Sequence, residues 1–141
     1  MRIFVDQSAW LAVADKNDPL HRAFQTELKN YLQGGHRFYT TNVVIGNVVS
    51  ELKQKQSTRL ANQFYSIIEE AWLGTYLHIL WIGRRTFKDA IRLFNKFPDS
   101  QLSLFDCANV VLMNRRNIRF ILTVNSAYNQ MGFKIVPQME K

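Results

Sequence analysis

Short apolar runs alternate with longer segments of helical character along this sequence, and that order constrains the fold more than any other feature. The apolar runs cover residues 3–5, 37–41, 78–82, 120–124 and 134–136. The segments with helical periodicity or helix-capping residues cover residues 8–14, 19–33, 43–54, 57–72, 85–97 and 104–116. Apolar strands that alternate with helices are typical of a parallel sheet covered by helices on its two faces. We therefore predict an α/β protein of three layers, α/β/α, with a central parallel sheet of four to five strands.

The predicted helices begin at residues that are favoured as N-caps. Ser8 is expected to cap the first helix and Asn42 the third. Asp18 is expected to cap the second helix, because Pro19 directly after it suits the first helical position.

No repeat, low-complexity tract or linker divides the chain, so we expect a single domain over residues 1–141. No apolar run reaches the roughly 18 residues that a membrane helix requires. Asp6 interrupts the N-terminal apolar run too early for the core of a signal peptide. We therefore expect a cytoplasmic protein without a membrane segment. Cys107 is the only cysteine, which excludes a disulfide within the chain and a cysteine-based zinc site.

The sequence is basic, with 18 lysines and arginines, 11 acidic residues and a formal net charge of +7. A basic surface concentrates polyanions such as nucleic acid near a protein. The basic residues gather in two segments, Arg84, Arg85, Lys88, Arg92 and Lys96 in one, and Arg115, Arg116 and Arg119 in the other. Contact with a polyanion such as nucleic acid and simple solvation of helix faces both explain these clusters, and the sequence leaves the two open.

Polar side chains follow several of the predicted strands. Asp6 follows the first strand, Asn42 and Asn47 the second, and Asn125 the fourth. Ligands of parallel α/β sheets bind beyond the carboxyl ends of the strands, so these residues form the candidate site. Asp106, at the start of the helix before the fourth strand, can join them. The three histidines, in contrast, lack the spacing of metal ligands.

The sequence resembles the PIN-domain family, the fold of VapC-type toxin ribonucleases, from one end to the other. The matching segments are residues 3–9 (IFVDQSA), 15–21 (DKNDPLH), 40–47 (TTNVVIGN), 102–107 (LSLFDC) and 118–125 (IRFILTVN), followed by Gly132 and Phe133. The opening segment alone is a weak signal, whereas the ordered series over the whole length makes the resemblance specific.

The resemblance implies a metal-dependent endoribonuclease that cuts single-stranded or structured RNA. Family members gather three or four acidic side chains into one pocket, where they hold Mg²⁺ or Mn²⁺. Asp6 matches the first acidic position and Asp106 the third. Asn47 stands where the family usually has Glu, and Asn125 where Asp is frequent and Asn also occurs. By this match, Asp6 and Asp106 are the expected metal ligands, and Asn47 and Asn125 complete the catalytic set through amide oxygens or bound water.

The two asparagines leave the expected site less acidic than the family pattern. Each carboxylate that is lost costs about 1.5–3 kcal/mol of attraction for a divalent ion, or roughly 10- to 150-fold in metal affinity. Glu51 lies one helical turn after Asn47 and is a candidate for a compensating acid. The alternative for Glu51 is an exposed helix glutamate beside Lys53 and Lys55.

Two functions therefore stay open. The first is a divalent-metal-dependent endoribonuclease, weakened by its asparagines, that acts as the toxin of a toxin–antitoxin pair. Its expected substrate-binding residues are Ser8, Arg84, Arg85, Arg115 and Arg116. Ser8 is also expected to form hydrogen bonds within the site, which is compatible with capping its helix. The second is a catalytically silent PIN-like module that binds RNA or a protein partner. The resemblance also implies a homodimer and a cognate antitoxin.

Overall fold

Five parallel strands form the centre of the protein and confirm the predicted α/β architecture. The computed structural model describes residues 1–137. The strands are β1 (Arg2–Val5), β2 (Arg37–Thr41), β3 (Leu77–Leu80), β4 (Phe120–Leu122) and β5 (Lys134–Val136). They pair in the order β3-β2-β1-β4-β5, and every pair is parallel. β1 therefore occupies the middle of the sheet, with β4 directly beside it.

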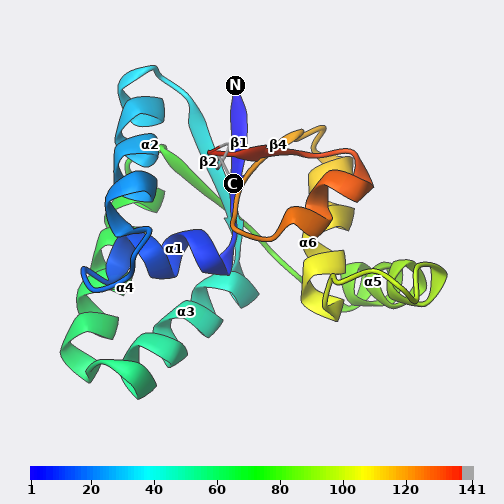
Figure 1. Ribbon diagram of the computed structural model, residues 1–141, viewed down its shortest axis with the longest axis horizontal. Coiled ribbons are helices and arrows are strands. Elements are labelled where there is room, and N and C mark those ends of the chain that lie inside the picture. Colours follow the sequence, from blue (N-terminus) through cyan, green and yellow to red (C-terminus); the bar gives the residue numbers. More distant parts are fainter. Residues whose placement is uncertain (138–141) are drawn as a thin grey trace.

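Helices cover the two faces of this sheet (Figure 1). On one side lie α1 (Gln7–Ala14), α2 (His21–Gln33), α3 (Asn42–Lys55) and α4 (Thr58–Leu73). On the other side lie α5 (Arg84–Lys96), α6 (Leu104–Arg115) and the short 3-10 helix η1 (Ser126–Met131). The predicted α/β/α layering is thus confirmed. None of the helices within residues 1–137 has both the length and the apolar character needed to cross a membrane.

The central strands are apolar because both of their faces are buried. Ile3, Phe4 and Val5 of β1 are completely buried, as are Ile121 and Leu122 of β4. Burying an apolar side chain of this size stabilises a fold by roughly 1.5–3 kcal/mol. The helices add buried side chains from both layers, among them Phe24, Val48, Leu52, Ile68 and Met113. Packing from both sides therefore fixes β1 and β4 in the middle of the protein.

The start of α1 differs from the prediction in a way that matters for the site. Asp6 caps this helix, not Ser8, because the Asp6 carboxylate accepts a hydrogen bond from the backbone N–H of Ala9 at 3.1 Å. Ser8 lies instead in the first turn of α1. Asp and Ser are both good N-caps. Because α1 begins directly after β1, the residue at the N-cap position is Asp6.

The start of α3 also differs from the prediction. Thr41 is the N-cap, because its hydroxyl accepts a hydrogen bond from the Val44 N–H at 3.0 Å. The predicted cap, Asn42, begins the helix, and its side-chain oxygen accepts from the Ile82 N–H at 2.7 Å. Asn42 therefore ties the start of α3 to the segment after β3.

The second helix begins later than predicted, at His21 rather than Pro19. Asp18 does act as a cap, but of the turn before the helix, because its carboxylate accepts from the Leu20 N–H at 2.8 Å. The proline therefore belongs to that turn.

The fourth strand is shorter than the predicted run, since β4 ends at Leu122. Thr123 still donates its backbone N–H to the Val136 carbonyl oxygen at 3.3 Å. The chain then enters η1, which the sequence pattern did not predict, with Asn125 as its N-cap. This early turn leaves the side chains after β4 at the edge of the sheet.

Candidate active site

The carboxyl ends of β1 and β4 bring Asp6 and Thr123 together. Val5 of β1 pairs with Leu122 of β4, and the Asp6 N–H donates to the Leu122 carbonyl oxygen at 3.2 Å. The next residues along the two strands, Asp6 and Thr123, are therefore neighbours. The Thr123 hydroxyl donates a hydrogen bond to Oδ2 of Asp6. A hydroxyl from a distant part of the chain thus orients the first expected metal ligand.

Asp6 is almost completely buried, with 5% of its surface exposed. Its Oδ1 atom accepts hydrogen bonds from the Ser8 hydroxyl at 2.7 Å and from the Ala9 N–H at 3.1 Å. Burial raises the pKa of Asp6 to about 6, although the hydrogen bonds from Thr123, Ser8 and Ala9 oppose the rise. The negative charge of Asp106 also raises this pKa. The two carboxylates therefore belong to one electrostatic environment.

Asp106 lies in the first turn of α6, where a capping box orients it. The Ser103 hydroxyl accepts from the Asp106 N–H at 3.1 Å, and Oδ2 of Asp106 accepts from the Ser103 N–H at 3.0 Å. Oδ1 of Asp106 accepts from the Tyr128 hydroxyl at 2.8 Å. One donor at the start of α6 and one in η1 thus hold the second expected metal ligand.

Tyr128 is completely buried in η1, and its hydroxyl links two side chains of α6. The Asn109 side-chain N–H donates to the Tyr128 oxygen at 3.2 Å, while the Tyr128 O–H donates to Asp106. Burial raises the pKa of Tyr128 well above its ordinary value, and the charges of Asp106 and Asp6 add to the rise. The hydroxyl therefore keeps its proton and remains a donor to Asp106.

These hydrogen bonds leave a limited number of oxygen positions for a metal ion. An ionised carboxylate offers about four acceptor positions. Hydrogen bonds occupy three of them on Asp6 and two on Asp106, which leaves one on Asp6 and two on Asp106. Mg²⁺ is commonly held by one or two carboxylates while it keeps several waters, and Mn²⁺ favours the same oxygen ligands. The two aspartates therefore fit a hydrated ion of this class.

The candidate acidic ligands at this site number two rather than three. Within residues 1–137, no group of three or more His, Cys, Asp or Glu side chains could hold a metal ion. The remaining oxygen ligands of an ion at this site would have to come from amides, water or substrate.

The two asparagines of the predicted catalytic set lie in different surroundings. The Asn125 backbone N–H donates to the Thr123 hydroxyl at 3.0 Å, so Asn125 is adjacent to the hydroxyl that holds Asp6. Its side-chain oxygen accepts from the Ala127 N–H at 3.0 Å and caps η1. Asn47 is exposed on α3, and no hydrogen bond among the described residues ties it to either aspartate. Asn125 thus lies close to Asp6, and one hydrogen bond already occupies its side-chain oxygen.

Glu51 does not join the two aspartates. Its carboxylate pairs with Lys55 at 3.0 Å, one turn along α3. It also lines a hollow together with Asp15 and Asp18. Of the two alternatives for Glu51, the structure supports the helix glutamate paired with a lysine.

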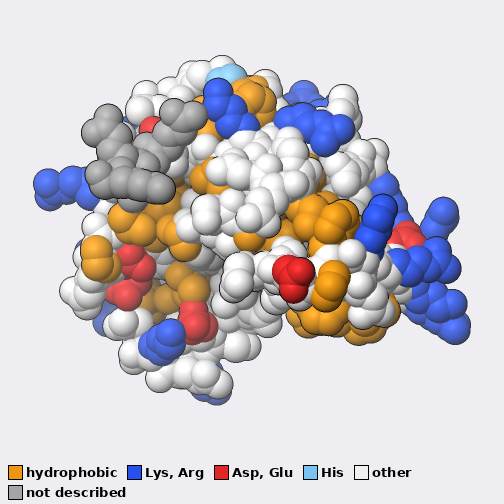
Figure 2. Space-filling view, turned by 45° about the vertical axis from the view of Figure 1, so that its right-hand side comes forward, with side chains coloured by type: hydrophobic (Ala, Val, Ile, Leu, Met, Phe, Trp, Pro, Cys, Tyr) orange, Lys and Arg blue, Asp and Glu red, His pale blue; other side chains and the backbone are white. Residues whose placement is uncertain are grey.

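Arg84 and Arg85 lie at the start of α5, after the short segment that leaves the carboxyl end of β3. The carboxyl end of β3 belongs to the same edge of the sheet as Asp6, because all five strands are parallel. Figure 2 shows Lys and Arg side chains gathered at the end of the molecule where α5 lies. The exposed basic residues of this helix are Arg84, Arg85, Lys88, Arg92 and Lys96. This edge therefore combines two carboxylates with a strongly basic helix.

Arg115 and Arg116 are separated from the aspartates. They lie at the C-terminal end of α6, while Asp106 lies in its first turn. At 1.5 Å per residue, this separation along the helix is about 14 Å. Arg115 also donates to the Thr86 hydroxyl at 2.9 Å and pairs with Asp89 of α5. Arg115 thus joins α5 to α6, and both arginines lie away from the two aspartates.

The sequence of the chain matches a known family. A family model described as PIN domain matches residues 3–134, which is most of the chain. The chain belongs to the PIN domain family.

Two relatives from Mycobacterium tuberculosis extend this comparison of the PIN domain. Ribonuclease VapC26 is 28% identical in an alignment that covers 96% of this chain and 100% of the relative. The crystal structure of VapC20, described as a sarcin–ricin loop cleaving toxin, has a TM-score of 0.79 and 19% sequence identity. That match covers 94% of this chain and 96% of VapC20. The likeness to VapC20 shows a shared fold.

Hydroxyl groups complete the site of this PIN domain, and sequence reasoning assigned them incompletely. Ser8 was expected to form hydrogen bonds within the site as well as to bind substrate, and its hydroxyl donates to Asp6 and accepts from the Val124 N–H at 3.1 Å. Thr123 was not identified, because its contact with Asp6 depends on the pairing of β1 with β4. The only sequence signal for Thr123 was its position two residues before Asn125, at the end of the fourth apolar run.

The two groups that hold Asp106 were also missed. Ser103 stands three residues before Asp106, the spacing of a capping box, and that pattern could have found it. Tyr128 has no comparable signal, because only the folding of η1 brings its hydroxyl to Asp106.

Proposed function

We propose that this PIN domain is a divalent-metal-dependent endoribonuclease of the VapC-toxin type. One observation carries the proposal: groups on the segment that leaves β4 hold both aspartates, since Thr123 donates to Asp6 and Tyr128 donates to Asp106. Both carboxylates therefore lie at the carboxyl edge of a parallel sheet, where such sheets bind their ligands. The names of two relatives support the substrate class, since VapC26 is a ribonuclease and VapC20 a sarcin–ricin loop cleaving toxin.

The side chains of the site have distinct roles in this proposal. Asp6 and Asp106 are the protein ligands of the metal ion, and Ser8, Thr123 and Tyr128 hold their carboxylates in place. Bound Mg²⁺ or Mn²⁺ would polarise the scissile phosphate and lower the pKa of an attacking water. Supporting groups of this kind matter because they fix the orientation of metal ligands.

Amide and basic groups complete the proposed site. Asn125 can add its remaining oxygen lone pair or hold a water next to Asp6. Asn47, on α3, can contribute through a water. Arg84 and Arg85 attract the RNA backbone toward the carboxylates.

Cleavage of a labelled RNA by the purified protein tests the proposal. We expect cleavage in Mn²⁺ or Mg²⁺ that stops when EDTA is added. Asp6→Asn and Asp106→Asn should each lower the rate at least about tenfold, because each removes a carboxylate from the metal ion. Glu70→Gln, an exposed position on α4, removes the same charge elsewhere and should have no effect. Cleavage that survives EDTA, or that both aspartate variants retain, would contradict the proposal.

A catalytically silent module is the second candidate function, and the asparagines favour it. Asn47 and Asn125 remove two carboxylates, and two acidic ligands remain. A silent module would bind RNA or a protein without cleaving RNA.

Asn47→Glu separates the two candidates. In a silent module, Mn²⁺ binding measured by calorimetry should be absent from wild type and should appear in this variant. In an active enzyme, wild type should already bind Mn²⁺, and the variant should bind more tightly. Ser50→Glu, also exposed on α3, adds the same charge one turn away and serves as the control. An equal gain in both variants would mean that net charge, not the site, determines the affinity.

Protein partners also belong to the proposal, namely a cognate antitoxin and a second copy of the chain. Exposed apolar side chains support them, since Leu73 is 85% exposed and Trp81 71% exposed. Light scattering tests the homodimer: twice the chain mass of 16.5 kDa is expected, and a single chain mass would contradict it. We place the proposed activity in the cytoplasm, where the protein would meet RNA.

A further inference from the structure

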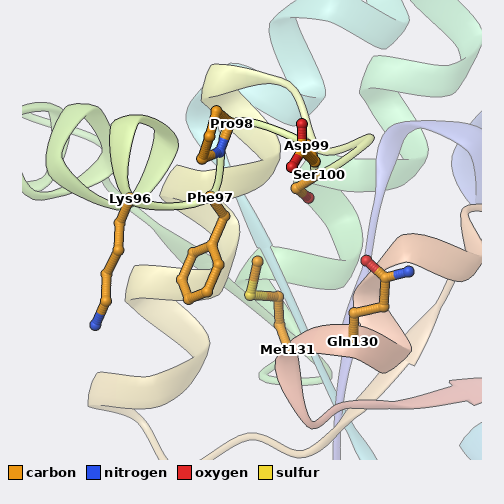
Figure 3. Close-up of a pocket in the computed structure, with 7 residues that line it drawn as sticks. All are labelled: Lys96, Phe97, Pro98, Asp99, Ser100, Gln130 and Met131. Atoms are coloured by element: carbon orange, nitrogen blue, oxygen red, sulfur yellow. The ribbon is translucent and has the colours of Figure 1, made fainter.

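A pocket of about 450 Å³ lies between the loop that joins α5 to α6 and the end of η1 (Figure 3). Its main lining side chains are Lys96, Phe97, Asp99, Ser100, Gln130 and Met131. Neither Asp6 nor Asp106 lines it. We propose that this pocket binds one unpaired guanine base of the RNA, beside the phosphate that the two aspartates act on. The inference rests on the proposed ribonuclease function and names a base for its substrate.

Two segments of the chain join the pocket to Asp106. Ser100 lies three residues before Ser103, whose N–H donates to the Asp106 carboxylate. Gln130 lies two residues after Tyr128, whose hydroxyl donates to the same carboxylate. An extended chain spans at most about 3.6 Å per residue, so the Cα atom of Ser100 lies within about 11 Å of that of Ser103, and the Cα atom of Gln130 within about 7 Å of that of Tyr128. A nucleotide close to the cleaved phosphate can therefore reach the pocket.

The pocket offers an aromatic surface on which a base can stack. The Phe97 ring is 42% exposed, and Figure 3 shows it extending from the loop toward Met131 of η1. Aromatic rings bind unpaired bases by stacking, and sequence-specific RNA recognition commonly uses bases that are turned out of a helix. A polarisable thioether beside the ring adds a second apolar contact for a flat ligand.

The polar groups of the pocket match guanine better than the other bases. Guanine presents two adjacent N–H donors on its pairing edge, whereas adenine, cytosine and uracil place an acceptor next to a donor. Asp99 offers a carboxylate, which only accepts hydrogen bonds when ionised. Gln130 offers a donor and an acceptor on the facing wall, from η1. Among the described residues, no hydrogen bond occupies the side chain of either one.

Lys96 balances the charge of the pocket. Its ammonium group lies 5.6 Å from the centre of the Phe97 ring, on the same wall as Asp99. An isolated carboxylate would repel the phosphates of the RNA. Lys96 offsets that repulsion and provides a contact for a phosphate next to the bound base.

Binding of short RNAs tests the inference. The probes are two fluorescein-labelled pentanucleotides, four uridines with a single guanosine or a single adenosine, measured by fluorescence anisotropy in EDTA so that no cleavage occurs. Wild type should bind the guanosine probe at least about fivefold more tightly. Asp99→Asn should remove this preference, because an amide can serve an acceptor edge as well as a donor edge. Equal binding of both probes by wild type would overturn the inference.

A matched pair of phenylalanine variants tests the stacking contact. Phe97→Ala should lower affinity for the guanosine probe roughly 5- to 150-fold, the usual effect of removing one stacking ring. Phe94→Ala is the control, because Phe94 is 44% exposed on α5 and does not line the pocket. Equal losses in the two variants would overturn the inference. If wild type binds Mn²⁺ and cleaves RNA while Phe97→Ala changes neither probe affinity nor cleavage, the pocket fails and the ribonuclease proposal stands.

Discussion

Tyr128 illustrates how much of this site depends on single side chains that hold other side chains. Its hydroxyl accepts from Asn109 and donates to Asp106, and all three groups come from η1 and α6. Groups that support metal ligands are commonly worth 10- to 100-fold in metal affinity, because they fix the ligand in one orientation. The tyrosine therefore ranks with the aspartates when the site is tested by mutation.

We expect Tyr128→Phe to weaken Mn²⁺ binding about 10- to 100-fold while the protein stays folded. The ring stays buried, and only the hydrogen bonds to Asp106 and Asn109 are removed. Calorimetric titration with Mn²⁺ measures the change. Tyr39→Phe is the control, since Tyr39 is also buried but stacks on His78 in β3. Unchanged Mn²⁺ affinity in Tyr128→Phe would show that Ser103 alone orients Asp106.

Because the pKa of Asp6 is raised, we expect the free energy of unfolding to depend on pH. Its pKa rises from 3.8 to about 6 in the folded protein, so folding favours the protonated form. The stability that this adds is fully present below about pH 4 and is lost as the pH rises through about 6. The free energy of unfolding of wild type, relative to Asp6→Asn, should therefore fall by about 2 kcal/mol between pH 4 and pH 7 without metal. Urea unfolding at a series of pH values measures it, and a flat difference would contradict it.

The basic residues fall into two groups, one at the start of α5 and one at the end of α6, and we expect only the first to contact RNA. The start of α5 lies at the carboxyl edge of the sheet, whereas the end of α6 lies about 14 Å along its axis from Asp106. Arg115 at that far end is engaged with α5. Position along a helix, rather than charge alone, therefore selects the arginines that can meet the RNA.

We expect the double variant Arg84→Ala and Arg85→Ala to weaken RNA binding and to reduce its dependence on salt. Each arginine that neutralises a phosphate of a single strand contributes about 0.7 to the slope of log K against log salt, so removing both should lower the slope by about 1.4. The control is Arg116→Ala with Arg119→Ala, which removes the same charge from exposed positions elsewhere. Equal slopes for the two double variants would contradict the assignment to α5.

Sequence reasoning succeeded for elements whose cause is local and failed where the cause is a distant partner. The strands could be predicted because both of their faces are apolar, as in residues 3–5. The caps of α1 and α3 were wrong because two good capping residues are close together in each case, and the strand end decides between them. The 3-10 helix η1 has no periodic signal, so the position of Tyr128 could not be foreseen.

Across the whole protein, metal and RNA should bind as a unit. Asp6 and Asp106 together leave three oxygen positions free, so water and a phosphate of the RNA can supply the rest of the coordination. Each ligand should therefore bind more tightly when the other is present, and by the same factor, because coupling between two sites is reciprocal.

We expect a cleavage-resistant RNA analogue to tighten Mn²⁺ binding about 5- to 150-fold, the usual range for coupled sites. Calorimetric titration of Mn²⁺ with and without the analogue measures this factor, and titration of the analogue with and without Mn²⁺ should return the same value. Asp106→Asn should abolish the coupling. Independent binding of the two ligands to wild type would mean that the phosphate takes no part in holding the ion.

Because β1 lies between β2 and β4 in the sheet, the candidate site cannot be completed until a late stage of translation. β1 leaves the ribosome well before its neighbour β4, which begins at Phe120, and the hydroxyls that hold the two aspartates follow at Thr123 and Tyr128. A nascent chain that ends before these residues carries both aspartates without the groups that orient them. The proposed nuclease activity would therefore appear only after translation has passed Tyr128.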